Sequence, residues 1–342
     1  MKVCIYGAGA IGAHIGVLLK LAGVDVSLIA RGPHLAAIKE NGLRLIIDGE
    51  DKVAQMPATK DPAELGQQDY VIVTLKSHQA WEVAEDLKPL LGPDTAVVTA
   101  QNGIPWWYFY GIEGQYANLQ LESVDPGGRQ WKTIGPERVI GSTVYPAAEI
   151  LEPGVVKHIY GNRYGLGEPT REETPRIKRL AEAFDAAGLE PKIYPEIRND
   201  IWLKLWGNLC FNPISALTHG TLDIIATDPD TRPIARKMME EAEVIARRIG
   251  AHFRVDIERR INGAAKVGAH RTSMLQDLDK GRKLELDALL SSVQEIGRLV
   301  DAPTPTIDVI LGLTKQMGRM KNVYPVFPEA KTEDDEALAR AD

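Results

Sequence analysis

Residues 2–12 read KVCIYGAGAIG, a short apolar strand that runs directly into a glycine-rich turn. The turn has the spacing G-x-G-x-x-G and leads into the predicted helix Ile11–Leu21. A strand before this motif and a helix after it are the context that a dinucleotide-binding site requires. The next predicted strand, Asp25–Ile29, completes a strand–helix–strand unit. We therefore predict a dinucleotide-binding domain at the start of the chain.

Each glycine of the turn has an expected role. Gly7 allows the tight turn, Gly9 lets a pyrophosphate approach the backbone, and Gly12 lets the helix pack closely on the strand. The helix N-terminus offers the phosphates its free N–H groups and the positive end of its dipole. We expect the cofactor to contact the loop residues Gly7, Ala8, Gly9, Ala10, Ile11 and Gly12.

The end of the second strand indicates which cofactor binds. Sites that prefer NAD place an acidic residue there for the ribose 2′-hydroxyl, whereas NADP sites use a nearby arginine. Here the strand is followed by Ala30 and Arg31, without an acidic residue. The planar guanidinium of Arg31 can pair with a 2′-phosphate, although a solvent-exposed arginine at a loop start is the alternative. The sequence favours NADP(H) over NAD(H).

The rest of the first half alternates strand and helix patterns, which is typical of a sheet covered by helices. Two polar residues, Lys76 and Asn102, follow predicted strands at the carboxyl edge, where open α/β sheets bind ligands. Lys76 is a candidate cofactor contact or a surface lysine, and the Asn102–Gly103 pair is also an ordinary turn signal. The further expected strands are Leu43–Ile47, Asp69–Leu75, Thr95–Thr99, Val139–Val144, Gly154–His158, Arg163–Gly167 and Glu190–Tyr194, with helices Pro33–Asn41, Ala80–Leu87 and Arg176–Ala187.

Residues 104–111 read IPWWYFYG and place five consecutive aromatic side chains beside the expected nicotinamide site. They begin an insertion over about residues 104–135. Trp106–Tyr110 either form a wall or lid of the pocket or anchor this insertion.

Composition limits the classes of function. The 342 residues are 44% hydrophobic and 25% charged, as in ordinary globular proteins, and exceed the size of one average domain. A net charge of -7 argues against a nucleic-acid partner. The two cysteines lack metal-ligand spacing, so we expect no metal, and no stretch reaches the roughly 20 apolar residues of a membrane span. We expect a cytoplasmic enzyme.

The second half has helical periodicity and begins with residues 200–218, DIWLKLWGNLCFNPISALT. Lys204, Asn208 and Asn212 lie at i, i+4 and i+8, so they share one face of an otherwise apolar helix. Polar groups in an apolar wall are costly unless something pairs with them. The alternatives are a lysine that extends to solvent with two satisfied core amides, or a ligand-binding face.

We place an NADP-binding domain at residues 1–196, a helical domain at 197–326 and a charged, solvated tail at 327–342. A linker is expected over Pro195–Asn199, and the active site is expected between the two domains. The other expected helices are Ile234–Gly250, Ile257–Lys266, Leu284–Val300 and one from Pro303–Pro305 to Met317.

The segment Thr272–Asp287, TSMLQDLDKGRKLELD, supplies two more candidates. Ser273 is either a helix N-cap or a ligand contact. Glu285 is either a first-turn partner of a helix dipole or an acidic group of the site.

Together these motifs resemble the ketopantoate reductase (2-dehydropantoate 2-reductase) family over residues 1 to about 320. The resemblance implies a Rossmann-type α/β domain followed by an all-helical domain like the carboxyl-terminal domain of 6-phosphogluconate dehydrogenase. GAGAIG with Arg31 resembles the family's NADPH loop, and Lys76 and Asn102 stand at its cofactor-side lysine and asparagine. Asn102 would also contact substrate.

The family's K-x-x-x-N-x-x-x-N-P helix is matched by residues 201–217, IWLKLWGNLCFNPISAL. By that match Lys204 is the catalytic lysine, and Asn208 and Asn212 bind substrate. TSMLQD resembles the S-M-x-Q-D segment, which implies that Ser273 binds the substrate carboxylate and that Glu285 is the acidic catalytic partner.

The chain departs from the family pattern at the aromatic insertion and at His270, where an asparagine would be expected. Both departures are expected to touch the substrate pocket. The implied reaction is NADPH-dependent reduction of ketopantoate to pantoate in pantothenate biosynthesis. From the apolar content of the helical domain we also expect a homodimer formed through that domain. The alternatives are a related reductase for another 2-oxo or hydroxy acid, or a non-catalytic NADP(H)-binding regulator.

Overall fold

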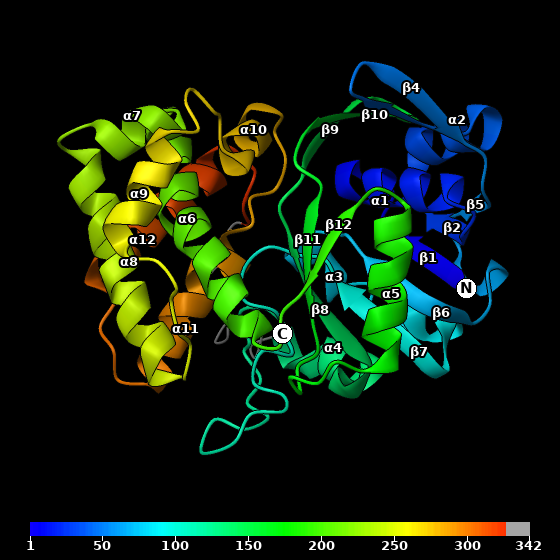
Figure 1. The fold of residues 1–342 in the computed structure, drawn as a ribbon. Helices are drawn as coiled ribbons and strands as arrows, with labels where there is room; N and C mark the ends of the chain where they lie inside the picture. The colour runs from blue at the N-terminus through cyan, green and yellow to red at the C-terminus, as the bar shows by residue number, and fades with distance from the viewer. Residues whose placement is uncertain (326–342) are drawn as a thin grey trace, which may run out of the picture.

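An eight-stranded sheet forms the centre of the amino-terminal half of the computed structural model, which describes residues 1–325 (Figure 1). Its order is β12-β11-β8-β7-β6-β1-β2-β5, and every neighbouring pair is parallel except β8 and β11. Helices cover both of its faces, which explains why its central strands are continuous apolar runs. The strands are β1 Lys2–Tyr6, β2 Asp25–Ile29, β5 Ala58–Thr59, β6 Gln68–Val73, β7 Leu91–Thr99, β8 Val139–Val144, β11 Arg163–Gly167 and β12 Glu190–Ile193.

A second, four-stranded sheet has the order β4-β3-β10-β9. Its strands contact α1, Ala10–Leu21, which also packs on β1 and β2 of the large sheet. α1 is therefore held between two sheets, and its first turn is fixed at the carboxyl edge of the large one. The strands are β3 Leu43–Ile47, β4 Glu50–Ala54, β9 Ala147–Glu152 and β10 Val155–Tyr160. The sequence does not predict β4, β5 or β9; β4 is largely exposed, β9 is only partly buried, and neither has a clear apolar pattern.

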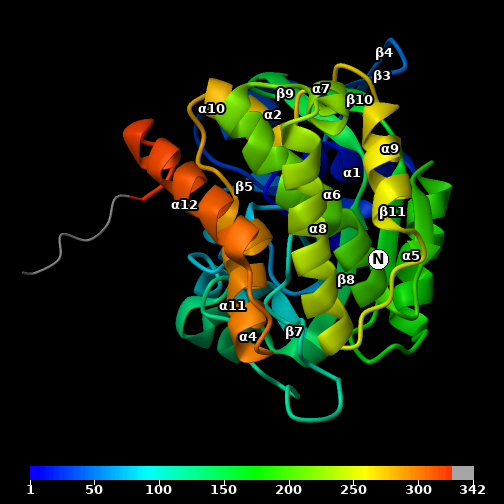
Figure 2. The ribbon, with the colours of Figure 1, turned by 90° about the vertical axis from the view of Figure 1, so that its left-hand side faces the viewer.

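The second half is a group of helices around α6, Ile197–Thr218 (Figures 1 and 2). α6 packs on helices α7–α10 and α12 and also contacts β8 and β11, so it belongs to both halves of the molecule. This central position explains why apolar residues surround its axis. The other helices are α7 Leu222–Thr227, α8 Thr231–Arg248, α9 Ile257–Ala265, α10 Ser273–Asp279, α11 Ser292–Leu299 and α12 Pro305–Met320. In the α/β half, α2 is Gly32–Asn41, α4 is Arg129–Ile134 and α5 is Pro175–Ala186.

Three local predictions are wrong. The expected linker is shorter because α6 already starts at Ile197. The helix expected at residues 80–87 is instead α3, Ser77–Ala80, followed by turns and a 3-10 helix, Glu85–Leu90, which contains a proline. The expected helix Leu284–Val300 begins later, with a π-helical turn over Asp287–Ser291 before α11. Glu285 therefore precedes the helix and does not lie in its first turn.

The aromatic segment is an anchor of the core and not a wall of the pocket. Trp107 is fully buried and its Nε1 donates to Thr99 Oγ1 at 2.8 Å. The Arg198 guanidinium at the start of α6 donates to the carbonyl oxygens of Tyr108 and Tyr110, at 2.7 and 2.5 Å. These contacts tie the insertion to α6, and none of the five aromatic residues lines the large cavity described below.

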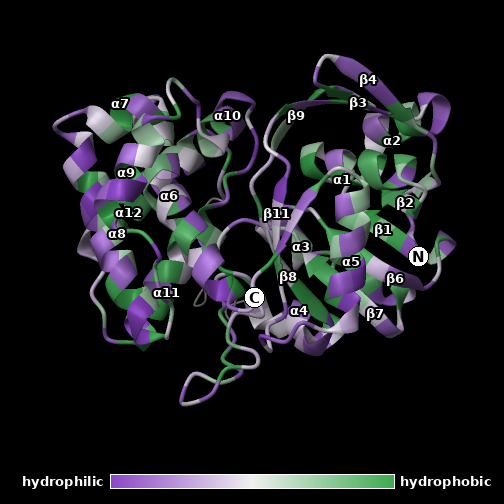
Figure 3. Ribbon diagram, in the orientation of Figure 1, coloured by the Kyte–Doolittle hydropathy of each residue, from purple (hydrophilic) through white to green (hydrophobic). Residues whose placement is uncertain are grey.

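The hydropathy of the residues follows this architecture, with apolar residues in the central strands and polar residues on the outer helix faces (Figure 3). Within residues 1–325, none of the helices combines the length and the apolar character needed to cross a membrane. The predicted tail at 327–342 lies outside the described residues.

Candidate active site

A cavity of about 1660 Å³ lies between the two halves of the molecule. The glycine loop, the segments that follow β6, β7 and β8, and residues of α6, α9 and α10 line it. It brings together eleven predicted site residues from distant parts of the chain. They are Gly7, Gly9, Ala10, Ile11, Lys76 and Asn102 from the α/β half, and Lys204, Asn208, Asn212, Ser273 and Glu285 from the helical half.

The glycine loop has the geometry of a phosphate-binding turn. Gly7 has a φ of 107°, which an L side chain rarely adopts, and Thr74 Oγ1 donates to its carbonyl oxygen at 2.5 Å. A Cβ on Gly12 would lie 2.1 Å from that same oxygen, so only glycine lets the helix approach the strand. Around Gly9 there is open space within 4 Å, so the loop backbone is accessible from the cavity. This arrangement fits a pyrophosphate at the N-terminus of α1.

Arg31 lies next to this loop, although it does not line the cavity. The N–H groups of Gly7 and Ala8 both donate to the carbonyl oxygen of Ile29 at 3.1 Å, which ties the loop to the end of β2. Arg31 follows two residues later and is exposed, and its side chain makes no hydrogen bond or ion pair with the rest of residues 1–325. Its guanidinium is available to a ligand at the rim of the loop.

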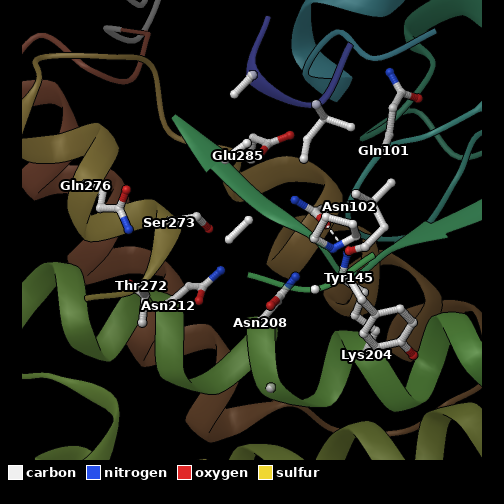
Figure 4. A pocket seen from close by; sticks show the side chains of 18 of the residues that line it. Gln101, Asn102, Tyr145, Lys204, Asn208, Asn212, Thr272, Ser273, Gln276 and Glu285 are labelled. Carbon is white, nitrogen blue, oxygen red and sulfur yellow. Dashed lines mark hydrogen bonds between the residues drawn. The ribbon is translucent and has the colours of Figure 1, made fainter. Parts of the chain in front are cut away.

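Lys204 meets Asn102 across the boundary between the α/β and helical halves (Figure 4). Its Nζ donates to Asn102 Oδ1 at 2.6 Å and to the carbonyl oxygen of Val144 at the end of β8. The Tyr145 ring lies 5.7 Å from the ammonium. The half-buried lysine is therefore fixed by the edge of the sheet and does not extend to solvent.

The cavity makes the Lys204 ammonium a weaker base than a surface lysine. Burial lowers the pKa of Lys204 to about 8, against the opposing effect of the carboxylates of Glu285 and Asp200. Burial disfavours a charged amine, while nearby negative charge favours it. A lysine with this pKa can hold a proton near neutral pH and release it readily.

Asn208 and Asn212 lie one and two turns after Lys204 on the same face of α6 (Figure 4). Neither side chain forms a hydrogen bond with a residue in the described part of the chain. Ser273 is also free of such bonds, because the N-cap of α10 is Thr272, whose Oγ1 accepts from the Leu275 N–H at 3.3 Å. The N-cap interpretation of Ser273 is therefore wrong, and three neutral polar groups face the cavity.

Glu285 and Lys76 both line the cavity, and their charges interact. Lys76 Nζ donates to Asp277 Oδ2 of α10 at 2.5 Å and to the Lys283 carbonyl oxygen at 3.1 Å, which connects the two halves. Burial raises the pKa of Glu285, with Lys76 opposing this effect. No ion pair joins Glu285 to Lys204 among residues 1–325, so Glu285 acts on the lysine through its charge and not by holding it.

Sequence reasoning missed a polar network under Lys204. Asp200 has a side chain that is 1% exposed, and it accepts from Thr143 Oγ1 at 2.5 Å and from Tyr145 Oη at 3.0 Å. Arg254 donates to the same carboxylate at 3.0 Å. Asp200 lies four residues, or one turn, before Lys204, so the sequence spacing already placed the two residues on the same face of the helix.

The cavity as a whole is positive. Nine basic side chains line it against four acidic ones, which are Glu149, Glu190, Asp277 and Glu285. A cleft with this balance attracts anionic ligands. The basic residues are Lys76, Arg163, Lys204, Arg254, Arg259, Arg260, Lys280, Arg282 and Lys283.

Comparisons with known proteins agree with this organisation. Residues 3–170 match the family model described as ketopantoate reductase PanE/ApbA, and residues 196–318 match the model of its carboxyl-terminal domain. A 2-dehydropantoate 2-reductase of Mesorhizobium japonicum is 52% identical over 325 residues, which cover 95% of this chain and 100% of that protein.

Solved structures give the same result. A structure from Ralstonia solanacearum, assigned to the ketopantoate reductases, has a TM-score of 0.90 at 41% identity and covers 94% of this chain and 99% of that one. A complex of D-mandelate dehydrogenase with NADH and anilino(oxo)acetate has a TM-score of 0.81 at 24% identity and covers 94% of this chain and 100% of that one, a likeness of fold only. The matching models span most of the chain, and the chain therefore belongs to the ketopantoate reductase family.

Proposed function

We propose that this protein reduces 2-dehydropantoate (ketopantoate) to pantoate with NADPH, a step of pantothenate biosynthesis. One observation carries the proposal: a lysine with a pKa of about 8 is held beside Asn102 in a positive cavity that also contains the glycine loop. The Mesorhizobium japonicum relative, which is named for this reaction, supports the choice of substrate.

The residues present fit a dinucleotide with a 2′-phosphate. The open backbone at Gly9 and the first turn of α1 would hold the pyrophosphate, and the unpaired Arg31 would hold the 2′-phosphate. Lys76 and Asn102, which follow β6 and β7, would contact the cofactor on the side of the cavity nearest the sheet. Bound NADPH would supply the hydride equivalent for the reduction.

Lys204 is proposed as the catalytic residue. Negative charge develops on a ketone oxygen as its carbon is reduced, and an ammonium beside that oxygen stabilises it strongly in a site shielded from water. Lys204 then gives the oxygen its proton. Asn208, Asn212 and Ser273 are proposed to bind the oxygens of the substrate without adding charge, and Glu285 to favour the protonated form of the lysine.

His270 favours a second candidate, a reductase for a different 2-oxo acid. It lines the cavity and packs edge-on against Tyr160, with ring centroids 5.8 Å apart. This side chain replaces the expected asparagine with a larger group in the same cavity, so the shape of the accepted substrate can differ. A non-catalytic NADP(H)-binding regulator is disfavoured, since such a protein has no use for Lys204 and Glu285 in one cavity.

NADPH oxidation with ketopantoate and with a panel of other 2-oxo acids tests this proposal. Turnover highest with ketopantoate supports the first candidate, and turnover highest with another 2-oxo acid supports the second. Tight NADPH binding without turnover on any member of the panel would contradict both and favour a regulator.

The proposed role of Lys204 predicts an alkaline limb in the pH profile. The protonated form of the lysine is the active one, and it is lost as the pH rises through about 8. We expect kcat/KM to be level below this pH and to fall about tenfold per pH unit above it. Steady-state kinetics from pH 6 to 10 measure the profile. A rate that stays level to pH 10 would contradict the role.

The proposed role of Arg31 predicts a change of cofactor preference. Replacing Arg31 with Ala removes the partner of the 2′-phosphate, and we expect KM for NADPH to rise about 10- to 100-fold while KM for NADH changes little. Fold stability should not change, because the side chain is exposed and makes no hydrogen bond or ion pair within residues 1–325. An equal rise in KM for NADPH and for NADH would show that Arg31 does not bind the 2′-phosphate.

A further inference from the structure

Arg260 enters the cavity beside the catalytic helix. It lies on α9, which packs on α6, and its guanidinium sits over Gly207. A Cβ at Gly207 would lie 2.1 Å from an Arg260 terminal nitrogen, and the other atoms closest to it are also Arg260 atoms. The missing side chain of Gly207 is thus what lets the guanidinium reach the surface of α6 between Lys204 and Asn208.

The Arg260 guanidinium has no protein partner within residues 1–325. No hydrogen bond or ion pair reaches it there, although the side chain is half-buried and lines the cavity. Burial lowers the pKa of Arg260, and the groups that oppose this effect are Cys210 and Tyr145, not a carboxylate. Three other cavity cations are paired: Arg254 with Asp200, Lys76 with Asp277 and Lys280 with Glu149. A desolvated arginine without an anion is costly, and a ligand that supplies one relieves that cost.

The position of Arg260 along α6 indicates which part of the substrate it meets. Gly207 is about 4.5 Å along the axis from Lys204, whereas Asn212 is about 12 Å away at 1.5 Å per residue. Ser273 lies on the Asn212 side of the cavity (Figure 4). In a 2-oxo acid the carboxylate is bonded directly to the ketone carbon. The residue that binds the carboxylate should therefore lie near Lys204, which is proposed to protonate the ketone oxygen.

We propose that Arg260 binds the carboxylate of the 2-oxo acid and restricts the site to anionic substrates. The planar guanidinium can form two parallel hydrogen bonds with a carboxylate. Ser273, on the Asn212 side of the cavity, is then available to bind a distal hydroxyl group of the substrate. This inference rests on the proposed function, and it differs from the family resemblance, which gives the carboxylate to Ser273.

The test compares ketopantoate with its uncharged methyl ester in NADPH-dependent reduction. In Arg260→Met we expect KM for the acid to rise about 10- to 100-fold, while KM for the ester changes by less than about twofold. Arg260→Lys should recover part of the loss. Arg298→Met is the matched control, because Arg298 is an exposed arginine on α11 outside the cavity, so this substitution removes the same charge away from the site. Its KM for the acid should change by less than about twofold.

Gly207→Ala tests the geometry without removing the charge. The new Cβ meets only the flexible end of Arg260, and alanine is preferred over glycine inside a helix, so the thermal unfolding midpoint should stay the same or rise. KM for the acid should still rise, and KM for the ester should not. Either of two results would overturn the inference. One is a rise in KM for the acid alone in Ser273→Ala that is absent in Arg260→Met. The other is an equal rise in KM for acid and ester in both Arg260→Met and Gly207→Ala.

A failure of the proposed function gives a different result. If the wild-type protein reduces neither ketopantoate nor any other 2-oxo acid, the proposed function is wrong, and the kinetics of the variants do not change that conclusion. The inference is then tested by the thermal stabilisation of the NADPH-bound protein by pyruvate and 2-oxoisovalerate. Stabilisation in the wild type and Arg298→Met, but not in Arg260→Met, supports it. Equal stabilisation in all three, or in none, overturns it.

Discussion

Replacing Lys204 with Ala should reduce kcat for ketopantoate about 10²- to 10⁴-fold while leaving NADPH binding nearly unchanged. The ammonium contacts Asn102 and the Val144 carbonyl at the edge of the sheet, where it would meet a ketone oxygen. Without it, charge on that oxygen is not stabilised and no lysine supplies its proton. The residues proposed to hold NADPH phosphates lie on the glycine loop and at Arg31, so NADPH affinity should survive.

Stopped-flow kinetics with saturating NADPH measure the chemical step, and NADPH fluorescence measures binding. Lys204→Arg is the matched control: it keeps the positive charge but does not release its proton near neutral pH. We expect a partial loss of rate and no alkaline limb near pH 8 in this variant. Near-normal turnover in Lys204→Ala would contradict the catalytic role.

Replacing Glu285 with Gln should reduce kcat about 10²-fold and move the alkaline limb of the pH profile to lower pH. The Glu285 carboxylate raises the pKa of Lys204 and so opposes the effect of burial. Removing this charge leaves burial less opposed, and the lysine loses its proton at a lower pH. Glutamine keeps the shape of the side chain, so the change tests charge.

The pH dependence of kcat/KM for the variant and the wild type measures the shift. Glu240→Gln, an acidic position on α8 outside the cavity, is the control and should leave the limb in place. A lower rate with an unmoved limb would show that Glu285 does not act through the charge of Lys204. An unchanged rate would remove Glu285 from the site.

Much of this site follows from local sequence patterns. The glycine loop is a contiguous motif, and its conformation is fixed by a few residues such as Gly7 and Gly12. The face formed by Lys204, Asn208 and Asn212 follows from the helix period, which brings i, i+4 and i+8 together in any regular helix. Local spacing was sufficient for these residues, and Gly7, Lys204, Asn208 and Asn212 line the cavity.

Other parts depend on contacts that no local pattern carries. Arg260 looks like one of several charges on an amphipathic helix, and only its position over Gly207 distinguishes it. The aromatic residues Trp106–Phe109 are buried, and Arg198 and Thr99, distant in sequence, bond polar groups of this segment. Strands β4 and β9 of the second sheet pack beside α1, yet their own sequences show little apolar alternation.

The reaction itself is tested most directly by incubating the purified protein with NADPH and ketopantoate and identifying the product by mass spectrometry. The account predicts one pantoate formed per NADPH oxidised, with kcat/KM for ketopantoate at least about tenfold higher than for other 2-oxo acids. It also predicts that Lys204→Ala forms almost no pantoate in the same assay. Absence of pantoate with the wild-type protein at saturating NADPH and ketopantoate would contradict it.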